Sequence, residues 1–144
     1  MTLINSLGVL VVLAVSAATS QKGGVVTVEA TGTRSLRGHT ACALWRPSDS
    51  FLEVKAAYRW VNAGIDRNRS VCVFEDVPAG TYAVSIFHDE NDNGALDTGF
   101  LGTPEEGYGF SNGAKAGAFG PPGFDEAAFA FDGTKTTITI GMAY

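Results

Sequence analysis

The feature that most constrains the fold of this chain is a series of short runs in which apolar and polar residues alternate. These runs span 26–30, 40–46, 57–61, 70–75, 81–88, 127–131 and 136–140. Because successive side chains of a β-strand point to opposite faces, this period of two predicts strands with one buried face. Few segments show the period of an α-helix.

Turn residues separate these runs and favour connections between strands. Pro78, Ala79 and Gly80 stand between two of the runs. Asp132-Gly133 stands between the last two runs, and an Asp-Gly pair in that position is a strong hairpin signal. About seven short strands with turns between them predict an all-β fold, an antiparallel β-sandwich.

The two cysteines lie in two of the expected strands. Cys42 shares a strand face with Leu44, and Cys72 shares one with Phe74, so both thiols are expected to point into the core. An even number of cysteines predicts one disulfide in an oxidising compartment, and two buried free thiols are the alternative. A bridge that closes this loop of roughly 30 residues would stabilise the fold by a few kcal/mol, mainly by constraining the unfolded chain.

The N-terminal segment favours export. Residues 7–14 form an uncharged apolar run, LGVLVVLA, and mostly small residues follow it. Val15 and Ala17 fit a signal-peptidase site, which predicts a signal peptide over 1–17, with cleavage between 18 and 20 as the alternative. The apolar run is shorter than the about 20 residues that a transmembrane helix needs. We therefore expect an exported protein, periplasmic or extracellular, with no membrane span after cleavage; an uncleaved anchor or a buried strand is the alternative.

Length and charge limit the remaining classes. Residues 24–144 are long enough for a single domain with its own core. The formal net charge of -5 argues against nucleic-acid binding, which needs a basic surface. Only two histidines are present, so a histidine-rich zinc site is not expected.

The segment 94–123 differs from the rest of the chain in composition. It is rich in glycine, contains three prolines and shows no sustained period. It also holds Phe100, Tyr108, Phe110 and Phe119, whereas disordered linkers are poor in aromatic residues. We therefore expect one long ordered loop whose aromatic side chains pack on the sheet, and such loops are often functional. Alternatively, these side chains stack on sugar rings or anchor a protein partner.

The stretch 88–97, HDENDNGALD, carries the clearest chemical signal. It matches the first part of the calcium-loop pattern D-x-[DN]-x-[DN]-G. Calcium takes about six to eight oxygen ligands, and short acidic and amide side chains on a tight turn aim their oxygens at one point. The expected ligands are the side chains of Asp89, Asn91, Asn93 and Asp97, the carbonyl of Ala95 and the carboxylate of Glu106.

The match to a helix-loop-helix calcium site is incomplete. The twelfth position is Phe100 rather than a bidentate Glu, and a strand rather than a helix is expected before the loop. Six acidic residues and no Lys or Arg lie between His88 and Asn112, so this segment repels itself unless a cation neutralises it. A solvated turn rich in Asp, Asn and Gly is the alternative.

Catalysis is a second hypothesis. A hydrolase would use His88 as a general base together with carboxylates of the loop, such as Asp97 and Glu106. We prefer to interpret His88 as a strand-end residue that orients the loop. His39 follows Gly38 without a visible partner and is interpreted as an exposed turn residue.

Longer stretches of the sequence resemble a known family. HDENDNGALDTGFLGTPEEGYGFSN and FGPPGFDEAAF, with FEDVPAGTYAVSIFHDEN before them, are similar to a family of small secreted bacterial proteins classed only as a domain of unknown function. VPAGTYAVSI is more loosely similar to transthyretin-like and carboxypeptidase-regulatory-like sandwich domains. The resemblance covers 24–144. It implies an exported bacterial protein with an immunoglobulin-like or prealbumin-like sandwich, and it implies no activity.

The resemblance also implies a common site. Its expected members are His88, Asp89, Asn91, Asn93, Gly94, Asp97, Glu106, Gly107, Tyr108, Gly109 and Phe110. Together with the loop chemistry, this favours a calcium-stabilised envelope domain that binds a glycan or an envelope protein, or a structural module of an envelope assembly. The side chains expected to bind are those of His88, Phe100, Tyr108 and Phe110.

Overall fold

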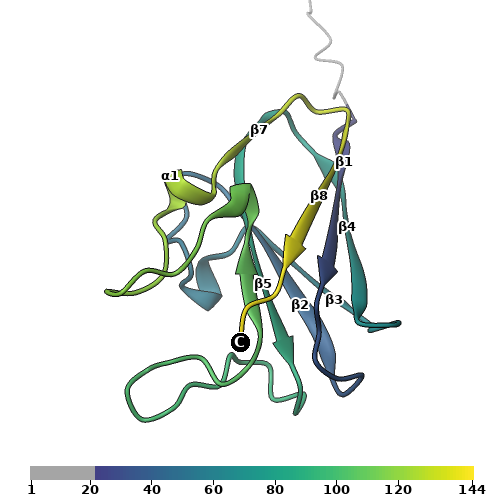
Figure 1. Cartoon of the computed structure of the whole chain (residues 1–144). Coiled ribbons are helices and arrows are strands. Elements are labelled where there is room, and N and C mark those ends of the chain that lie inside the picture. Colours follow the sequence, from purple (N-terminus) through teal and green to yellow (C-terminus); the bar gives the residue numbers. More distant parts are fainter. Residues whose placement is uncertain (1–21) are drawn as a thin grey trace, which may run out of the picture.

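The computed structural model describes residues 22–144 and consists of two packed β-sheets (Figure 1). The three-stranded sheet has the order β4-β1-β8, formed by Arg69–Val77, Gly24–Thr31 and Lys135–Gly141. The five-stranded sheet has the order β3-β2-β5-β6, and β7 also pairs with β5. Its strands are β2 (His39–Trp45), β3 (Arg59–Ala63), β5 (Gly80–Asp89), β6 (Tyr108–Phe110) and β7 (Phe129–Phe131). The predicted all-β sandwich is confirmed, and the expected signal peptide lies outside the described residues.

The alternation in the sequence corresponds to alternate burial along the strands. Val26, Val28 and Ala30 of β1 are buried, whereas the residues between them are half-buried. β1 pairs in antiparallel fashion with β4 and in parallel fashion with β8. One pair of strands in the sandwich is therefore parallel, and the other pairs are antiparallel.

The main core lies between the two sheets. Its largest buried side chains include Leu44 of β2, Phe74 of β4 and Ile86 of β5. Cys42 of β2 is bonded to Cys72 of β4, with 6.5 Å between their Cα atoms. The predicted disulfide is confirmed, and it joins one sheet to the other.

Two local predictions near the C-terminal end were wrong. Asp132-Gly133 does not close a hairpin, because β7 pairs with β5 whereas β8 pairs with β1 in the other sheet. The turn signal is local, and the choice of partner depends on which strand edge is free in the folded domain. The strand expected over 127–131 begins only at Phe129, because the short helix α1 (Phe124–Ala127) precedes it.

The long segment 94–123 is ordered, as expected, but it is not wholly irregular. It contains β6 and the 3₁₀ turn η2 (Ser111–Gly113), where Ser111 Oγ donates to the carbonyl of Ala127 over 2.6 Å. The only other 3₁₀ turn of the described chain is η1 (Val54–Ala56), and α1 is its one α-helix. With helices this short, no helix in the described part of the chain could cross a membrane.

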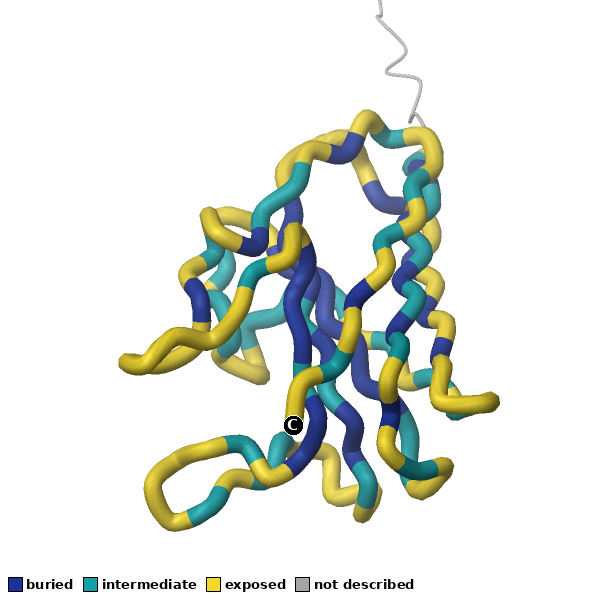
Figure 2. Tube along the Cα trace, in the orientation of Figure 1, coloured by how far each residue is buried: buried dark blue, intermediate teal, exposed yellow. Residues whose placement is uncertain are grey.

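The outer face of the five-stranded sheet is covered at one end only. Trp45, Ala83, Phe110 and Ala127 form a second buried cluster there, with Phe51 packed against Trp45 at 5.5 Å between ring centroids. Two loops project from this side of the molecule, and their tips are exposed (Figures 1 and 2). The uncovered part of this sheet face therefore lies beside the loops that carry the sequence signature.

Candidate functional site

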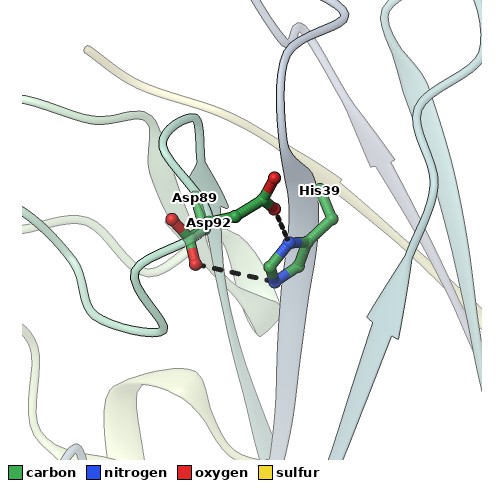
Figure 3. Close-up of side chains that lie close together, drawn as sticks. All are labelled: His39, Asp89 and Asp92. Carbon is green, nitrogen blue, oxygen red and sulfur yellow. Dashed lines mark hydrogen bonds and ion pairs between the residues drawn. The ribbon is translucent and has the colours of Figure 1, made fainter.

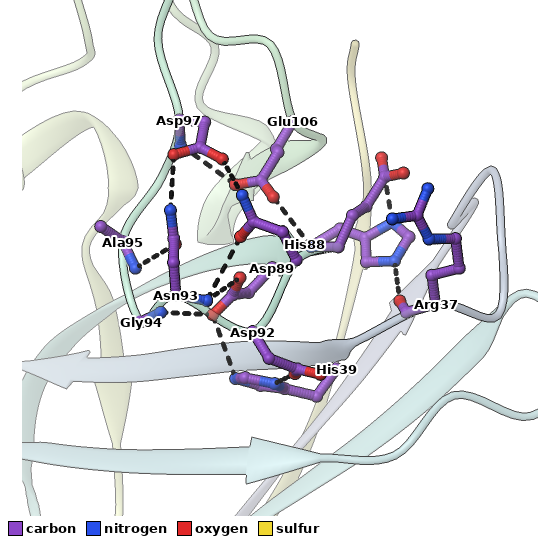
Figure 4. Close-up of polar contacts among 12 residues, drawn as sticks. Arg37, His39, His88, Asp89, Asp92, Asn93, Gly94, Ala95, Asp97 and Glu106 are labelled. Carbon is purple, nitrogen blue, oxygen red and sulfur yellow. Dashed lines mark hydrogen bonds and ion pairs between the residues drawn. The ribbon is translucent and has the colours of Figure 1, made fainter.

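The acidic loop (89–97) begins at the last residue of β5 and is folded around its first side chain (Figure 4). Asp89 is completely buried, and its two carboxylate oxygens accept the backbone N–H groups of Asn93 at 3.1 Å and Gly94 at 2.8 Å. Asp92 and Gly94 both have positive φ, at 56° and 77°, which produces the tight bend. The loop is therefore curled by bonds between one buried carboxylate and the backbone.

Three of the predicted ligand side chains meet at one point on the exposed side of this loop. Asn91 Nδ2 donates to Asp97 Oδ2 at 2.6 Å, and Asn93 Nδ2 donates to Asp97 Oδ1 at 2.7 Å. The structure thus brings together positions 91, 93 and 97 through bonds from two amide nitrogens to one carboxylate, and their role as metal ligands stays a prediction. Ala95, the predicted carbonyl ligand, donates its N–H to Asn93 Oδ1 at 3.0 Å.

Glu106 holds the two ends of the loop together. It is buried, and its carboxylate accepts the N–H of Glu90 at 2.8 Å and the N–H of Asp97 at 3.0 Å. The N–H of Glu105 also donates to the carbonyl of Asp97. Glu106 therefore acts on the acidic loop from its base, just before β6, as a positioning residue.

His39 is not the exposed, unpartnered residue that the sequence suggested. It lies directly opposite Asp89 in the β2–β5 ladder, where side chains of facing residues share one side of the sheet. Its Nδ1 donates to Asp92 Oδ1 at 2.6 Å, and its Nε2 lies 3.7 Å from Asp89 Oδ2 (Figure 3). The interpretation failed because this partnership depends on strand register, which the local sequence of His39 does not contain.

Gly38 permits this close approach of β2 to the end of β5. Its φ is +66°, and a Cβ atom at this position would lie 1.8 Å from the carbonyl oxygen of Asp89. No other residue fits there without moving the backbone. The glycine before His39 is therefore a sequence feature of the site. Its reason becomes clear only when β2 is paired with β5, because the close contact is with Asp89.

His88 lies on the opposite face of β5 from Asp89 and is fully buried. Its Nε2 lies 2.8 Å from the carbonyl oxygen of Arg37, so this nitrogen must carry the proton. In the neutral ring, Nδ1 then accepts from the hydroxyl of Tyr144 at 2.8 Å. Both nitrogens are engaged inside the protein, so the geometry gives no support to His88 as a general base.

The charges around the acidic loop are only partly neutralised. Arg34 Nε pairs with Glu90 at 2.6 Å, and His39 pairs with the two aspartates described above. Among the residues that the structure describes, no Lys, Arg or His pairs with the carboxylates of Asp97, Glu105 or Glu106. The part of the loop where the three ligand side chains meet therefore lacks a cation of its own.

The available donor set fits a hard cation such as calcium. It consists of carboxylate, amide and backbone oxygens, which are the ligands that calcium prefers. As they lie, Asn91 and Asn93 point their amide nitrogens at Asp97, and their oxygens accept the N–H groups of Asn93 and Ala95. A half-turn of each amide would present its oxygen to a cation at the position of the nitrogen and would give up these two backbone bonds. The carboxylates of Asp89 and Glu106 accept one backbone N–H on each oxygen, which leaves a further lone pair on each.

The four predicted binding residues do not come together. Tyr108 and Phe110 lie on the outer face of β6, with ring centroids 5.9 Å apart. Phe100 is fully exposed on the segment between the acidic loop and β6, and His88 is buried on the other side of β5. The expectation that the long loop packs its aromatics is therefore met by Tyr108 and Phe110 and not by Phe100 or Phe119, which are both fully exposed.

Tyr108 and Phe110 line a groove on the outer face of the five-stranded sheet. The groove has a volume of about 720 Å³ and runs between two loop segments, 95–104 and 116–121. Trp45 and Trp60, which the sequence did not mark as site residues, line it as well. Their signal was their place on the same strand face as Ser85 and Phe87, which becomes visible only with the register of β2, β3 and β5.

The comparison with protein families gives one match. Residues 28–139 match a family described as "Uncharacterized protein conserved in bacteria (DUF2141)". This range contains both cysteines, the acidic loop and the residues that line the groove. The predicted resemblance to a bacterial family of unknown function is confirmed, whereas searches of the curated proteins and of the solved structures give no match.

Proposed function

Since the chain belongs to this bacterial family, whose description names no activity, we propose from its geometry that it is an exported binding domain with a calcium-stabilised loop. The observation that carries the proposal is the meeting of the Asn91, Asn93 and Asp97 side chains at one point, without a cationic side chain beside them. A bound calcium ion would supply the missing positive charge there.

The residues of the chain have distinct roles in this proposal. Asp97, Asn91 and Asn93 hold the ion with their side-chain oxygens, and the carbonyl of Ala95 is the backbone ligand. Asp89 and Glu106 shape the loop through its N–H groups and present their remaining lone pairs from below. The ion and the backbone therefore share the same two buried carboxylates.

The loop is linked to the groove by the chain itself. Ala95 and Leu96 line one end of the groove, and 98–104 forms the wall beside it. Fixing the acidic loop therefore fixes one wall of the groove, which supports a binding role. The groove has a volume within the range of about 300–1,000 Å³ that is typical of ligand sites.

Export is the remaining part of the proposal. The disulfide between the sheets is compatible with an oxidising compartment such as the periplasm or the extracellular medium. The apolar N-terminal run supports the same assignment from the sequence.

Calorimetric titration tests the calcium site. We expect saturable binding of about one calcium ion per chain and much weaker binding of magnesium, which requires near-octahedral geometry. Asp97→Asn should remove this binding, whereas Asp66→Asn, an exposed aspartate in the β3–β4 connection, should leave it unchanged. No heat at calcium concentrations of about 10 mM, well above the range for extracellular modules, would sink the proposal, as would equal binding by the two variants.

A further inference from the structure

The groove on the outer sheet face has walls without charge. Its lining contains no Asp, Glu, Lys, Arg or His, and its large side chains are mostly aromatic. Trp60, Phe87 and Tyr108 lie across the sheet, and Leu101 and Phe119 come from the two flanking segments. An uncharged aromatic lining selects for an uncharged, apolar ligand.

The polar groups of the two tryptophans in this lining are already engaged within the protein. Trp45 Nε1 donates to Ser85 Oγ at 3.0 Å, and Trp60 Nε1 donates to the carbonyl of Val54 at 3.2 Å. A sugar ring has several hydroxyl groups that lose water on binding and need replacement hydrogen bonds. The lining holds the hydroxyls of Thr98, Thr103 and Tyr108, but its other side chains are almost all apolar. Three hydroxyls are fewer than the hydroxyl groups of one or two sugar rings, so the lining favours a ligand without hydroxyl groups over a glycan.

The edge of β6, which borders the groove, has no free backbone groups at Tyr108 with which a peptide strand could pair. Tyr108 of β6 exchanges backbone hydrogen bonds with Ala143, at 2.9 Å and 2.8 Å. Across the groove, Gly117 and Gly120 pair with each other. A peptide that added a strand here would have to displace these bonds.

Apolar side chains at the rim lack cover. The side chains of Leu101 and Phe119, on opposite sides of the groove, have relative exposures of 83% and 105%. Large exposed apolar side chains around a concave surface are typical of ligand or interaction sites. A ligand seated between the two segments would remove both side chains from water.

We propose that the groove binds the acyl chain of a lipid whose head group is uncharged, an inference that rests on the binding function proposed above. An acyl chain needs no hydrogen bonds and gains its affinity from apolar contact along its length. The neighbouring segment 88–112, which contains the acidic loop, has six acidic residues and no Lys or Arg. One bound calcium ion would offset only two of these charges, so the surface beside the groove stays negative and disfavours an anionic head group. The acyl ligand and the groove therefore match in both polarity and charge.

Tryptophan fluorescence tests this assignment directly. Trp45 and Trp60 are the only tryptophans of the chain, and both line the groove. Dodecyl maltoside carrying bromine in its alkyl chain, added below its micelle concentration, should quench their emission in a saturable way. The unbrominated detergent should not quench, and maltose should not compete. Absence of quenching, or competition by maltose at a similar concentration, would overturn the proposal.

A matched set of exposed positions separates the groove from other apolar surfaces. Phe119→Asp should weaken binding of the brominated detergent about tenfold or more, because a bound chain buries this side chain. Leu36→Asp changes an exposed leucine outside the groove and should have no effect. Equal quenching curves for the two variants would mean that the detergent binds elsewhere.

Phe100 distinguishes a groove from insertion of loop tips into a membrane. It is fully exposed beside Leu101 but does not line the groove. Phe100→Asp should therefore leave quenching unchanged, and a loss as large as that of Phe119→Asp would favour insertion and contradict the groove assignment. Repeating the titration in calcium and in chelator separates the two proposals. Quenching without calcium binding would contradict the calcium site and support the acyl ligand. Calcium binding without quenching would contradict the acyl ligand and support the calcium site.

Discussion

The acidic loop and the segment that follows it are adjacent in the chain, but their side chains differ in contacts: those of the loop form hydrogen bonds, and the large apolar ones of the next segment are exposed. In 89–97, side chains bond to backbone N–H groups and to one another, and Asp89 is completely buried. In 98–104, the described hydrogen bonds join backbone groups only, and Phe100 and Leu101 project into solvent. One region is ordered by its own polar contacts, and the other leaves its apolar side chains uncovered.

The difference shows what each region lacks. Pairing within the acidic loop still leaves Asp97, Glu105 and Glu106 without a described cation partner, so the missing element is positive charge. The segment 98–104 faces 116–121 across the groove, and there the missing element is apolar contact. These two features are the basis on which we propose a cation for the acidic loop and an apolar ligand for the groove.

The disulfide lies in the core between the two sheets. Its removal should have the largest effect on the free energy of unfolding. The double variant Cys42→Ala, Cys72→Ala, which adds no polar group to the core, should lower the free energy of unfolding by about 3.5 kcal/mol, because the bridge closes a loop of 30 residues in the unfolded chain. Urea denaturation measures the loss. The folded fraction should retain both regions, so a variant that folds but fails to bind at only one of them would show that the bridge serves that region in particular.

Asp89→Ala should affect the acidic loop and spare the groove walls. The N–H groups of Asn93 and Gly94 would lose their acceptor, at a cost of about 2–3 kcal/mol in unfolding free energy without calcium. The loss should be larger with calcium, because the variant also lacks a carboxylate that faces the ion. Asp66→Ala, at an exposed carboxylate, should stay within about 0.5 kcal/mol of the parent. Hydrogen exchange at the amides of residues 93 and 94 should accelerate. A loss seen only with calcium would mean that these backbone bonds contribute little.

Alkaline pH tests how the C-terminal residue supports the loop. Burial raises the pKa of Tyr144 above its ordinary value of 10.0, and the neighbouring Glu90 adds to this, against opposing effects of Arg34. A group whose pKa is raised by folding stabilises the fold fully below its unfolded pKa, and that stability is lost as pH rises through the folded pKa.

Stability should therefore fall as pH rises above about 10, and Tyr144→Phe should reduce the slope of that fall. Denaturation midpoints measured between neutral pH and the alkaline range give the comparison. Burial also raises the pKa of Tyr82, so part of the slope should persist in the variant. An unchanged slope would contradict the assignment to Tyr144.

The exposed rim should give the smallest effect on stability. Phe100→Ser and Phe119→Ser should each change the unfolding free energy by no more than about 0.5 kcal/mol, because neither side chain is buried. Thermal denaturation of both variants checks this. A loss above about 1 kcal/mol would mean that the rim packs on the sheet in solution, and the contrast with the acidic loop would disappear.

Some parts of the site were accessible from the sequence and others were not. The alternation around Val28 and Ile86 predicted which strand faces are buried, and the spacing of Asn91, Asn93 and Asp97 predicted that these side chains meet. The Asp132-Gly133 turn misled, since β8 joins β1 instead of β7. His39 was missed because its partners lie across the sheet.

Local patterns determined what depends on a few neighbouring residues: the strands, the burial of their inner faces and the curl of the acidic loop. These features follow from backbone geometry and short-range hydrogen bonding. Strand register and sheet order were decided only in the folded domain, because they arise from competition among edges far apart in the chain. That competition set His39 opposite Asp89 and gathered Trp45, Trp60 and Tyr108 along one uncharged groove. The chain thus encodes its acidic loop locally, whereas the groove beside it exists only as a product of tertiary structure.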